Sequence, residues 1–289
     1  MPPEPPVMSV HTLGEAYALL AGAVADGEPA YRPLAGGTDL MVQLAADVGP
    51  VPQRLLDVWP LDELRGVERR DGALVLGALT TYTELRRSPL VAEALPALAE
   101  VAATVGAVQI QNRGTLGGNV ANASPAGDTL PLLLAADAEI VLGSIRGERA
   151  VAAADFWTGY RRTALAKDEL VVRIRVPLPA RRHLRFRKVG TRRAQAISKV
   201  VMALAWREDG GVWRDVRLAL GSVAPTPMRA GRTEAVLEGA APRRTSAEHA
   251  AATLAAEISP IDDVRSTAAY RRAVAGRVLH RLLRDAGGW

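Results

Sequence analysis

The most informative stretch of this chain is Gln111-Asn112-Arg113-Gly114-Thr115-Leu116-Gly117-Gly118-Asn119-Val120-Ala121-Asn122-Ala123-Ser124-Pro125-Ala126-Gly127-Asp128. It is rich in Gly, Asn, Ser, Thr and Ala with little apolar periodicity, so it predicts a long ordered loop over 112–128. Closely spaced glycines allow backbone N–H groups to approach a ligand. Thr115 and Asn119 add side chains that form hydrogen bonds. Because ordered loops of this length are more often functional than idle, we expect a binding site here.

Two charged residues of this stretch leave alternatives open. Arg113 either pairs with a phosphate or anchors the loop. Asp128 precedes the apolar helical stretch 130–136. Its ordinary role at this position is an N-cap, and its more specific role is a ligand contact.

A second glycine pair lies upstream, in Pro33-Leu34-Ala35-Gly36-Gly37-Thr38-Asp39-Leu40. The pattern predicts a strand that runs into the glycines and then a helix that Thr38 or Asp39 caps. A helix N-terminus beside exposed N–H groups favours phosphate. The stretch is neither a G-x-G-x-x-G nor a Walker motif, and capped turns of this composition are common. Together the two stretches suggest a pyrophosphate held between them, and two turns without chemistry are the alternative.

Apolar periodicity places the remaining elements. Helices are expected over 13–24, 38–45, 91–105 (with Pro96 breaking or bending it), 130–136, 232–237, 247–257 and 267–284. Strands are expected over 31–35, 53–58, 74–79, 139–142, 170–176, 184–189, 200–207 and 212–223. The alternating order before Pro177-Leu178-Pro179 indicates α/β architecture, and strands followed by helices after it indicate α+β. We therefore expect one domain over 1–178 and a second over 179–289.

Composition excludes several classes of protein. Hydrophobic residues make up 48% and charged residues 23%, which indicates a folded chain with disorder confined to its ends. With no cysteine, the chain holds no disulfide, thiolate metal site or cysteine-bound iron–sulfur cluster. The four histidines have no ligand spacing, so we expect no metal site. No apolar run approaches the ~20 residues of a membrane span, and the start lacks secretory features, so the cytoplasm is the default location.

The net charge of +5 and pI near 9.9 have two interpretations. Nucleic-acid binding is one. With aromatic residues at only 4%, stacking partners are scarce, and a codon bias toward Arg and Ala is the blander explanation. A basic surface also suits an anionic cofactor or an acidic partner.

Four motifs resemble the FAD-binding subunits of molybdenum hydroxylases, the family of xanthine dehydrogenases, carbon monoxide dehydrogenases and related aromatic hydroxylases. Ala35 to Leu40 resembles their first flavin loop. Asn112 to Asn119, with the following Ala123-Ser124-Pro125 and Asp128, resembles the second, and this match is highly specific. Phe186-Arg187-Lys188-Val189-Gly190 with Arg192-Arg193 resembles the opening of the C-terminal domain, and Ser259 to Ser266 with Tyr270-Arg271-Arg272 resembles its last motif. The order and spacing match from about residue 8 to 286.

The resemblance implies two α/β subdomains that clamp FAD, followed by a small sheet with helices. Carried over by position, the cofactor-binding residues are Ala35, Gly36, Gly37, Thr38, Asp39, Leu40, Thr115, Leu116, Gly117, Gly118, Asn119, Asp128, Leu170 and Lys188. Asp128 would accept hydrogen bonds from the flavin. Lys188 would place positive charge near the reduced ring, or is a surface strand lysine. Leu170 would pack on the cofactor, or is plain core, and 262–272 is expected to serve domain packing.

In this family an iron–sulfur subunit relays electrons from a molybdopterin-binding subunit to FAD, which reduces NAD or another acceptor. Hydride transfer from reduced flavin needs no acid–base side chain, so we expect no catalytic residue. Two alternatives remain open at this point. One is a self-sufficient flavin oxidase of the same fold, and the other is a non-enzymatic nucleic-acid-binding or structural protein.

Overall fold

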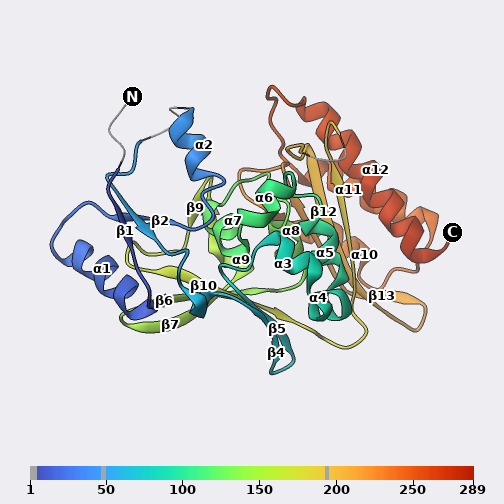
Figure 1. The fold of residues 1–289 in the computed structure, drawn as a ribbon. Helices are drawn as coiled ribbons and strands as arrows, with labels where there is room; N and C mark the ends of the chain where they lie inside the picture. Colours follow the sequence, from blue (N-terminus) through green and yellow to red (C-terminus); the bar gives the residue numbers. More distant parts are fainter. Residues whose placement is uncertain (1–4, 47–49, 193–194) are drawn as a thin grey trace.

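The computed structural model describes residues 5–46, 50–192 and 195–289, which form three larger sheets and one two-stranded hairpin (Figure 1). The first four residues of the N-terminal end, where disorder was expected, and Arg193 of the C-terminal motif lie outside these ranges. Within them, no helix combines the length and apolar character needed to cross a bilayer.

The first sheet is parallel and three-stranded, in the order β1-β3-β2. Its elements are β1 (Val7–Ser9), α1 (Leu13–Ala25), β2 (Tyr31–Leu34), α2 (Leu40–Ala45), β3 (Arg54–Asp57) and the 3-10 turn η1 (Asp62–Leu64). Helix α1 begins with a capping box, in which the Thr12 hydroxyl accepts from the Glu15 N–H and the Glu15 carboxylate accepts from Thr12. The predicted helix over 13–24 and strands over 31–35 and 53–58 are confirmed.

The second sheet has five strands in the order β4-β5-β10-β6-β7, and every neighbouring pair is antiparallel. The strands are β4 (Val67–Arg70), β5 (Ala73–Gly77), β6 (Glu139–Ser144), β7 (Gly147–Ala152) and β10 (Leu170–Pro177). The expected two-subdomain fold is confirmed, but the α/β order of the sequence did not predict antiparallel pairing here. A small hairpin of β8 (Trp157–Gly159) and β9 (Arg162–Thr163) precedes β10.

Short helices connect the strands of the second sheet. They are α3 (Tyr82–Arg87), α4 (Pro89–Ala94), α5 (Pro96–Ala102), α6 (Val108–Arg113), α7 (Leu116–Asn122), α8 (Leu130–Ala135) and α9 (Ala153–Phe156). The expected break at Pro96 is confirmed, because proline has no N–H to continue a helix and occupies the first position of α5. The expected long loop over 112–128 is wrong, since α7 and the end of α6 lie within it.

The third sheet is antiparallel, in the order β11-β12-β13-β14, and three helices cover one of its faces (Figure 1). Its elements are β11 (His183–Val189), β12 (Val200–Asp209), β13 (Val212–Gly221), β14 (Met228–Arg229), α10 (Gly231–Leu237), α11 (Arg244–Glu257) and α12 (Ala268–Gly287). Alternate residues of β12 point to opposite faces. Val201 and Ala203 join the core of the second sheet, whereas Met202 and Leu204 join a core with the three helices. Burial on both faces explains the continuous apolar run of β12.

Asp137 connects the second and third sheets by ion pairs. It occupies the turn between α8 and β6, with a left-handed φ of 54°. Its carboxylate forms ion pairs with Arg182 (3.2 Å), Arg217 (2.5 Å) and Arg229 (3.4 Å), all from the C-terminal part of the chain. Three cations on one carboxylate hold the edge of the third sheet against this turn.

Candidate functional site

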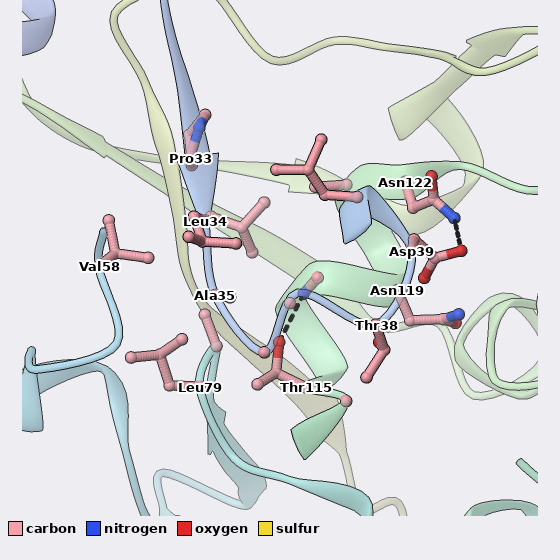
Figure 2. A pocket seen from close by; sticks show the side chains of 18 of the residues that line it. Pro33, Leu34, Ala35, Thr38, Asp39, Val58, Leu79, Thr115, Asn119 and Asn122 are labelled. Carbon is pink, nitrogen blue, oxygen red and sulfur yellow. Dashed lines mark hydrogen bonds between the residues drawn. The ribbon is translucent and has the colours of Figure 1, made fainter. Parts of the chain in front are cut away.

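Two adjoining cavities, of about 380 and 1120 Å³, lie beside the glycine stretches, and the larger one extends to the third sheet. The smaller cavity is lined by the first glycine stretch, by α7 and by the start of β10. All the residues labelled in Figure 2 line this smaller cavity. The larger opens between the residues before α6, the loop before α8 and the third sheet. Seven residues line both cavities: Thr38, Asp39, Val105, Ile110, Asn119, Asn122 and Arg161. The cavities therefore form one cleft, with a junction at these residues.

The first glycine stretch presents free backbone donors at this cleft. Among the described residues, the N–H groups of Gly36, Gly37 and Thr38 have no acceptor within hydrogen-bond distance. The backbone turns here because Gly37 adopts a φ of 73°, in the region that glycine favours. Three consecutive unpaired N–H groups form a cradle suited to an anion.

Asp39 occupies the N-cap position of α2 but does not cap it. No side-chain hydrogen bond closes the start of α2, so the expected cap by Thr38 or Asp39 is wrong. The Asp39 carboxylate instead accepts from the Asn122 amide nitrogen at 2.9 Å (Figure 2). This contact ties the first glycine stretch to the end of α7.

Gly36 is needed because the two glycine stretches touch. A Cβ atom at Gly36 would lie 1.7 Å from the carbonyl oxygen of Arg113. No larger residue fits without moving one backbone away from the other. The Arg113 guanidinium, for its part, lies 3.8 Å from the ring centroid of Trp59, a cation–π contact. Of the two roles open for Arg113, anchoring of the loop is the one that this contact supports.

The second glycine stretch does not offer the free N–H groups that its sequence suggested. The first three N–H groups of α7 are already paired: Leu116 with the Thr80 carbonyl (3.0 Å), Gly117 with the Ala78 carbonyl (2.8 Å) and Gly118 with the Thr115 hydroxyl (3.1 Å; Figure 2). A Cβ atom at Gly117 would lie 2.6 Å from that of Ala78. The glycines thus let a capped helix pack closely against the residues after β5. This tertiary packing overrides their low helix propensity.

Asn119, Asn122 and Arg161 meet at the junction. The Asn119 side-chain oxygen accepts from the Thr129 hydroxyl at 2.5 Å. Arg161, in the β8–β9 turn, donates to the Asn122 side-chain oxygen at 2.9 Å. Neither Asn122 nor Arg161 was predicted to have a role. Asn122 lies within the quoted stretch, but nothing in the sequence around Arg161 marks it.

Asp128 and Lys188 form a buried ion pair in the larger cavity. The Lys188 ammonium lies 2.5 Å from one Asp128 oxygen and donates to the Thr104 carbonyl at 3.0 Å. Burial raises the pKa of Asp128 to about 6, although Lys188 acts to lower it. The other Asp128 oxygen is buried with no hydrogen-bond partner among the described residues. The N-cap role considered for Asp128 is wrong, because Thr129 takes that position before α8.

The remaining predicted site residues lie apart from this pair. Ala35, Leu40 and Leu170 line the smaller cavity, and Leu170 is buried at the start of β10. Leu116 is fully buried and lines neither cavity. Of the motif expected to serve domain packing, Arg271 donates to the carbonyls of Lys199 and Ser222, pairs with Asp263 at 2.7 Å and also lines the larger cavity.

The cradle of free N–H groups and the cleft of two joined cavities suit an elongated, anionic ligand. Residues 4–179 match the family described as the FAD binding domain in molybdopterin dehydrogenase. Residues 185–286 match the CO dehydrogenase flavoprotein C-terminal domain. The chain belongs to this family of FAD-binding oxidoreductase subunits.

Relatives match along nearly the whole chain. The carbon monoxide dehydrogenase medium chain of Hydrogenophaga pseudoflava is 33% identical over 98% of each chain. A putative xanthine dehydrogenase FAD-binding subunit of Escherichia coli K12 is 31% identical, over 96% of this chain and 95% of that one. Among solved structures, the Hydrogenophaga carbon monoxide dehydrogenase superposes with a TM-score of 0.91 at 34% identity, covering 97% of this chain and 96% of the matched chain.

Proposed function

We propose that FAD lies along the two joined cavities, with its pyrophosphate at the N–H groups of Gly36, Gly37 and Thr38. These three donors support the proposal most directly, because they lie beside the junction and no described residue accepts from them. Charge-assisted hydrogen bonds to such donors are the strong ones. Ala35, Asp39 and Leu40 complete this stretch of the site.

The two ends of the cofactor fit different surroundings. The smaller cavity includes the apolar side chains of Leu34, Val58 and Leu170, which suit the adenine face. In the larger cavity, the unpaired Asp128 oxygen suits a hydroxyl or ring N–H of the flavin half, and Lys188 fixes the carboxylate. Asn119 lies between the two ends. Thr115, Leu116, Gly117 and Gly118 act indirectly, because they build the capped α7 against which the cofactor lies.

In this proposal the chain is the electron-transfer subunit of a molybdenum hydroxylase complex. When bound, the flavin supplies the redox chemistry, and the chain supplies binding, orientation and exclusion of water. The chain has no cysteine for a cluster, so its electrons come from an iron–sulfur subunit, which is supplied by a molybdopterin-binding subunit. NAD or another acceptor takes them on, and the complex works in the cytoplasm.

The cofactor site is tested by removing one backbone donor. Thr38→Pro eliminates the N–H of residue 38, whereas the matched variant Thr38→Ala keeps that N–H and loses only the hydroxyl. Loss of a hydrogen bond to a charged group raises the dissociation constant for FAD about tenfold to a hundredfold. We expect this loss in Thr38→Pro and not in Thr38→Ala, with both variants folded by circular dichroism. Equal FAD binding by both would exclude residue 38 as a donor to the pyrophosphate.

The partnership is tested by purification from the native source. We expect the chain to elute with one larger chain and one smaller, cysteine-rich chain. A native mass equal to this chain alone would contradict the subunit role.

A further inference from the structure

The junction of the two cavities needs a positive charge that the glycine stretches do not provide. A pyrophosphate carries its negative charge into a cleft where solvation is reduced, and backbone N–H groups compensate for only part of it. The first N–H groups of α7 are committed within the protein, so they add nothing. A side-chain cation is the remaining means of compensation.

Five basic residues line the cavities in the described part of the chain: Arg32, Arg161, Lys188, Arg265 and Arg271. Three of them already have carboxylate partners, since Lys188 pairs with Asp128, and both Arg265 and Arg271 pair with Asp263. Arg32 lines the smaller cavity only, from an exposed position on β2. Arg161 alone among the five lines both cavities, and it forms no ion pair with a described carboxylate.

The position of Arg161 is held by two connected hydrogen bonds. Its guanidinium donates to the Asn122 oxygen at 2.9 Å, and the Asn122 nitrogen donates to Asp39 at 2.9 Å. Both ends of the Asn122 amide are therefore used, which fixes its orientation. The Arg161 side chain is in this way linked to the stretch that carries the free N–H groups.

The backbone at Arg161 is unfavourable for an arginine. Its φ is 51°, in the left-handed region, and it lies between β8 and β9 at a turn position where glycine or asparagine is usual. Such conformations are strained for residues other than glycine, and they collect at functional sites. The side chain is exposed, so core packing does not account for the arginine.

We propose that Arg161 is a further cofactor-binding residue, which pairs with the pyrophosphate, and that Asn122 is its positioning residue. This assignment rests on the FAD site proposed above. A dinucleotide electron acceptor carries the same phosphate chemistry. We assign FAD because Arg161 lies at the junction, linked through Asn122 to the free N–H groups.

The test measures FAD and riboflavin affinities of the FAD-depleted full chain, by quenching of flavin fluorescence. Riboflavin has no phosphate, so it reports on the flavin half alone. We expect Arg161→Gln to raise the dissociation constant for FAD about tenfold to a hundredfold, with riboflavin binding unchanged. The neighbouring Arg162 lines neither cavity, and Arg162→Gln is the matched control that keeps wild-type FAD affinity.

A second variant separates binding from folding. Arg161→Gly removes the cation and relieves the left-handed strain, so its thermal unfolding temperature should equal or exceed that of wild type while its FAD affinity falls. Asn122→Ala should weaken FAD binding less than Arg161→Gln, because the cation stays but loses its support.

Several results would overturn the assignment of Arg161. One is an FAD affinity of Arg161→Gln equal to that of wild type. If the KM of this variant for a nicotinamide dinucleotide is raised as well, Arg161 binds the electron acceptor and not FAD. Another is an equal loss of riboflavin and FAD affinity. Failure of the wild-type chain to bind FAD at all would instead reject the proposed cofactor site.

Discussion

Asp128 gives a prediction with a defined sign and pH range. Burial raises its pKa from the ordinary 3.8 to about 6, against the lowering effect of Lys188. The folded chain therefore binds a proton at Asp128 more tightly than the unfolded chain does. The ionised carboxyl weakens the folded state at neutral pH, and this penalty disappears as the pH falls through 6 toward 3.8. Asp128→Asn removes the titration, so the two proteins should respond differently to pH.

The magnitude follows from the two pKa values. A rise from 3.8 to about 6 is about two units, which corresponds to about 3 kcal/mol when the group is ionised in both states. At pH 5 the folded carboxyl is about nine-tenths protonated, so about 1 kcal/mol of this penalty is recovered between pH 7 and pH 5. Wild type should gain about that much stability relative to Asp128→Asn over this range.

The assay is urea unfolding of the FAD-depleted chain at pH 7, 6 and 5, for wild type and variant. Other carboxyls titrate alike in both proteins, so the difference in unfolding free energy isolates Asp128. Asp168→Asn is a matched control, because an Arg146 hydrogen bond lowers the pKa of Asp168 and takes its titration below this range. The reasoning would be refuted if the difference in unfolding free energy between wild type and Asp128→Asn did not change with pH. It would also be refuted if wild type lost stability relative to Asp128→Asn toward pH 5. Lys188→Met should move the inflection to higher pH.

Three further experiments concern the glycine contacts, the Asp137 ion pairs and the activity of the chain alone. Gly36→Ala and Gly117→Ala should each lower the free energy of unfolding in urea by about 1–3 kcal/mol, because the added Cβ meets backbone atoms. In the control Gly22→Ala, in α1, the Cβ meets nothing within 4 Å, so this change should be neutral or stabilising. Asp137→Asn should cost about 1–2 kcal/mol in the same assay, since three arginines lose a half-buried partner, and an unchanged midpoint would count against its role in joining the sheets. The purified, FAD-loaded chain should not oxidise purines, aldehydes or carbon monoxide in a dye-reduction assay, because substrate electrons enter through centres that it lacks. Turnover by the chain alone would favour a self-sufficient oxidase.

Element positions were predictable wherever apolar periodicity was strong. The period of α1, the apolar run of β12 and the break at Pro96 all appear where the sequence placed them. The proposed division at 178/179 stays a prediction. The direction of strand pairing in the second sheet was not predictable, because β10 pairs between β5 and β6, which precede it by about 30 residues or more. Long-range pairing of this kind leaves no local pattern.

The two glycine stretches show that a glycine-rich motif does not by itself reveal which group its backbone approaches. Both stretches converge on one cleft, as their resemblance to flavin loops implied, yet only the first has free N–H groups. In the second, Gly117 is small because Ala78 lies against it, a contact across about 40 residues of chain that composition alone does not reveal. A glycine-rich sequence predicts close approach of the backbone, but the approaching group is as readily another part of the protein as a ligand. Because the first N–H groups of α7 are paired within the protein, we assign the compensation of cofactor charge to Arg161 instead. No sequence motif marks this residue.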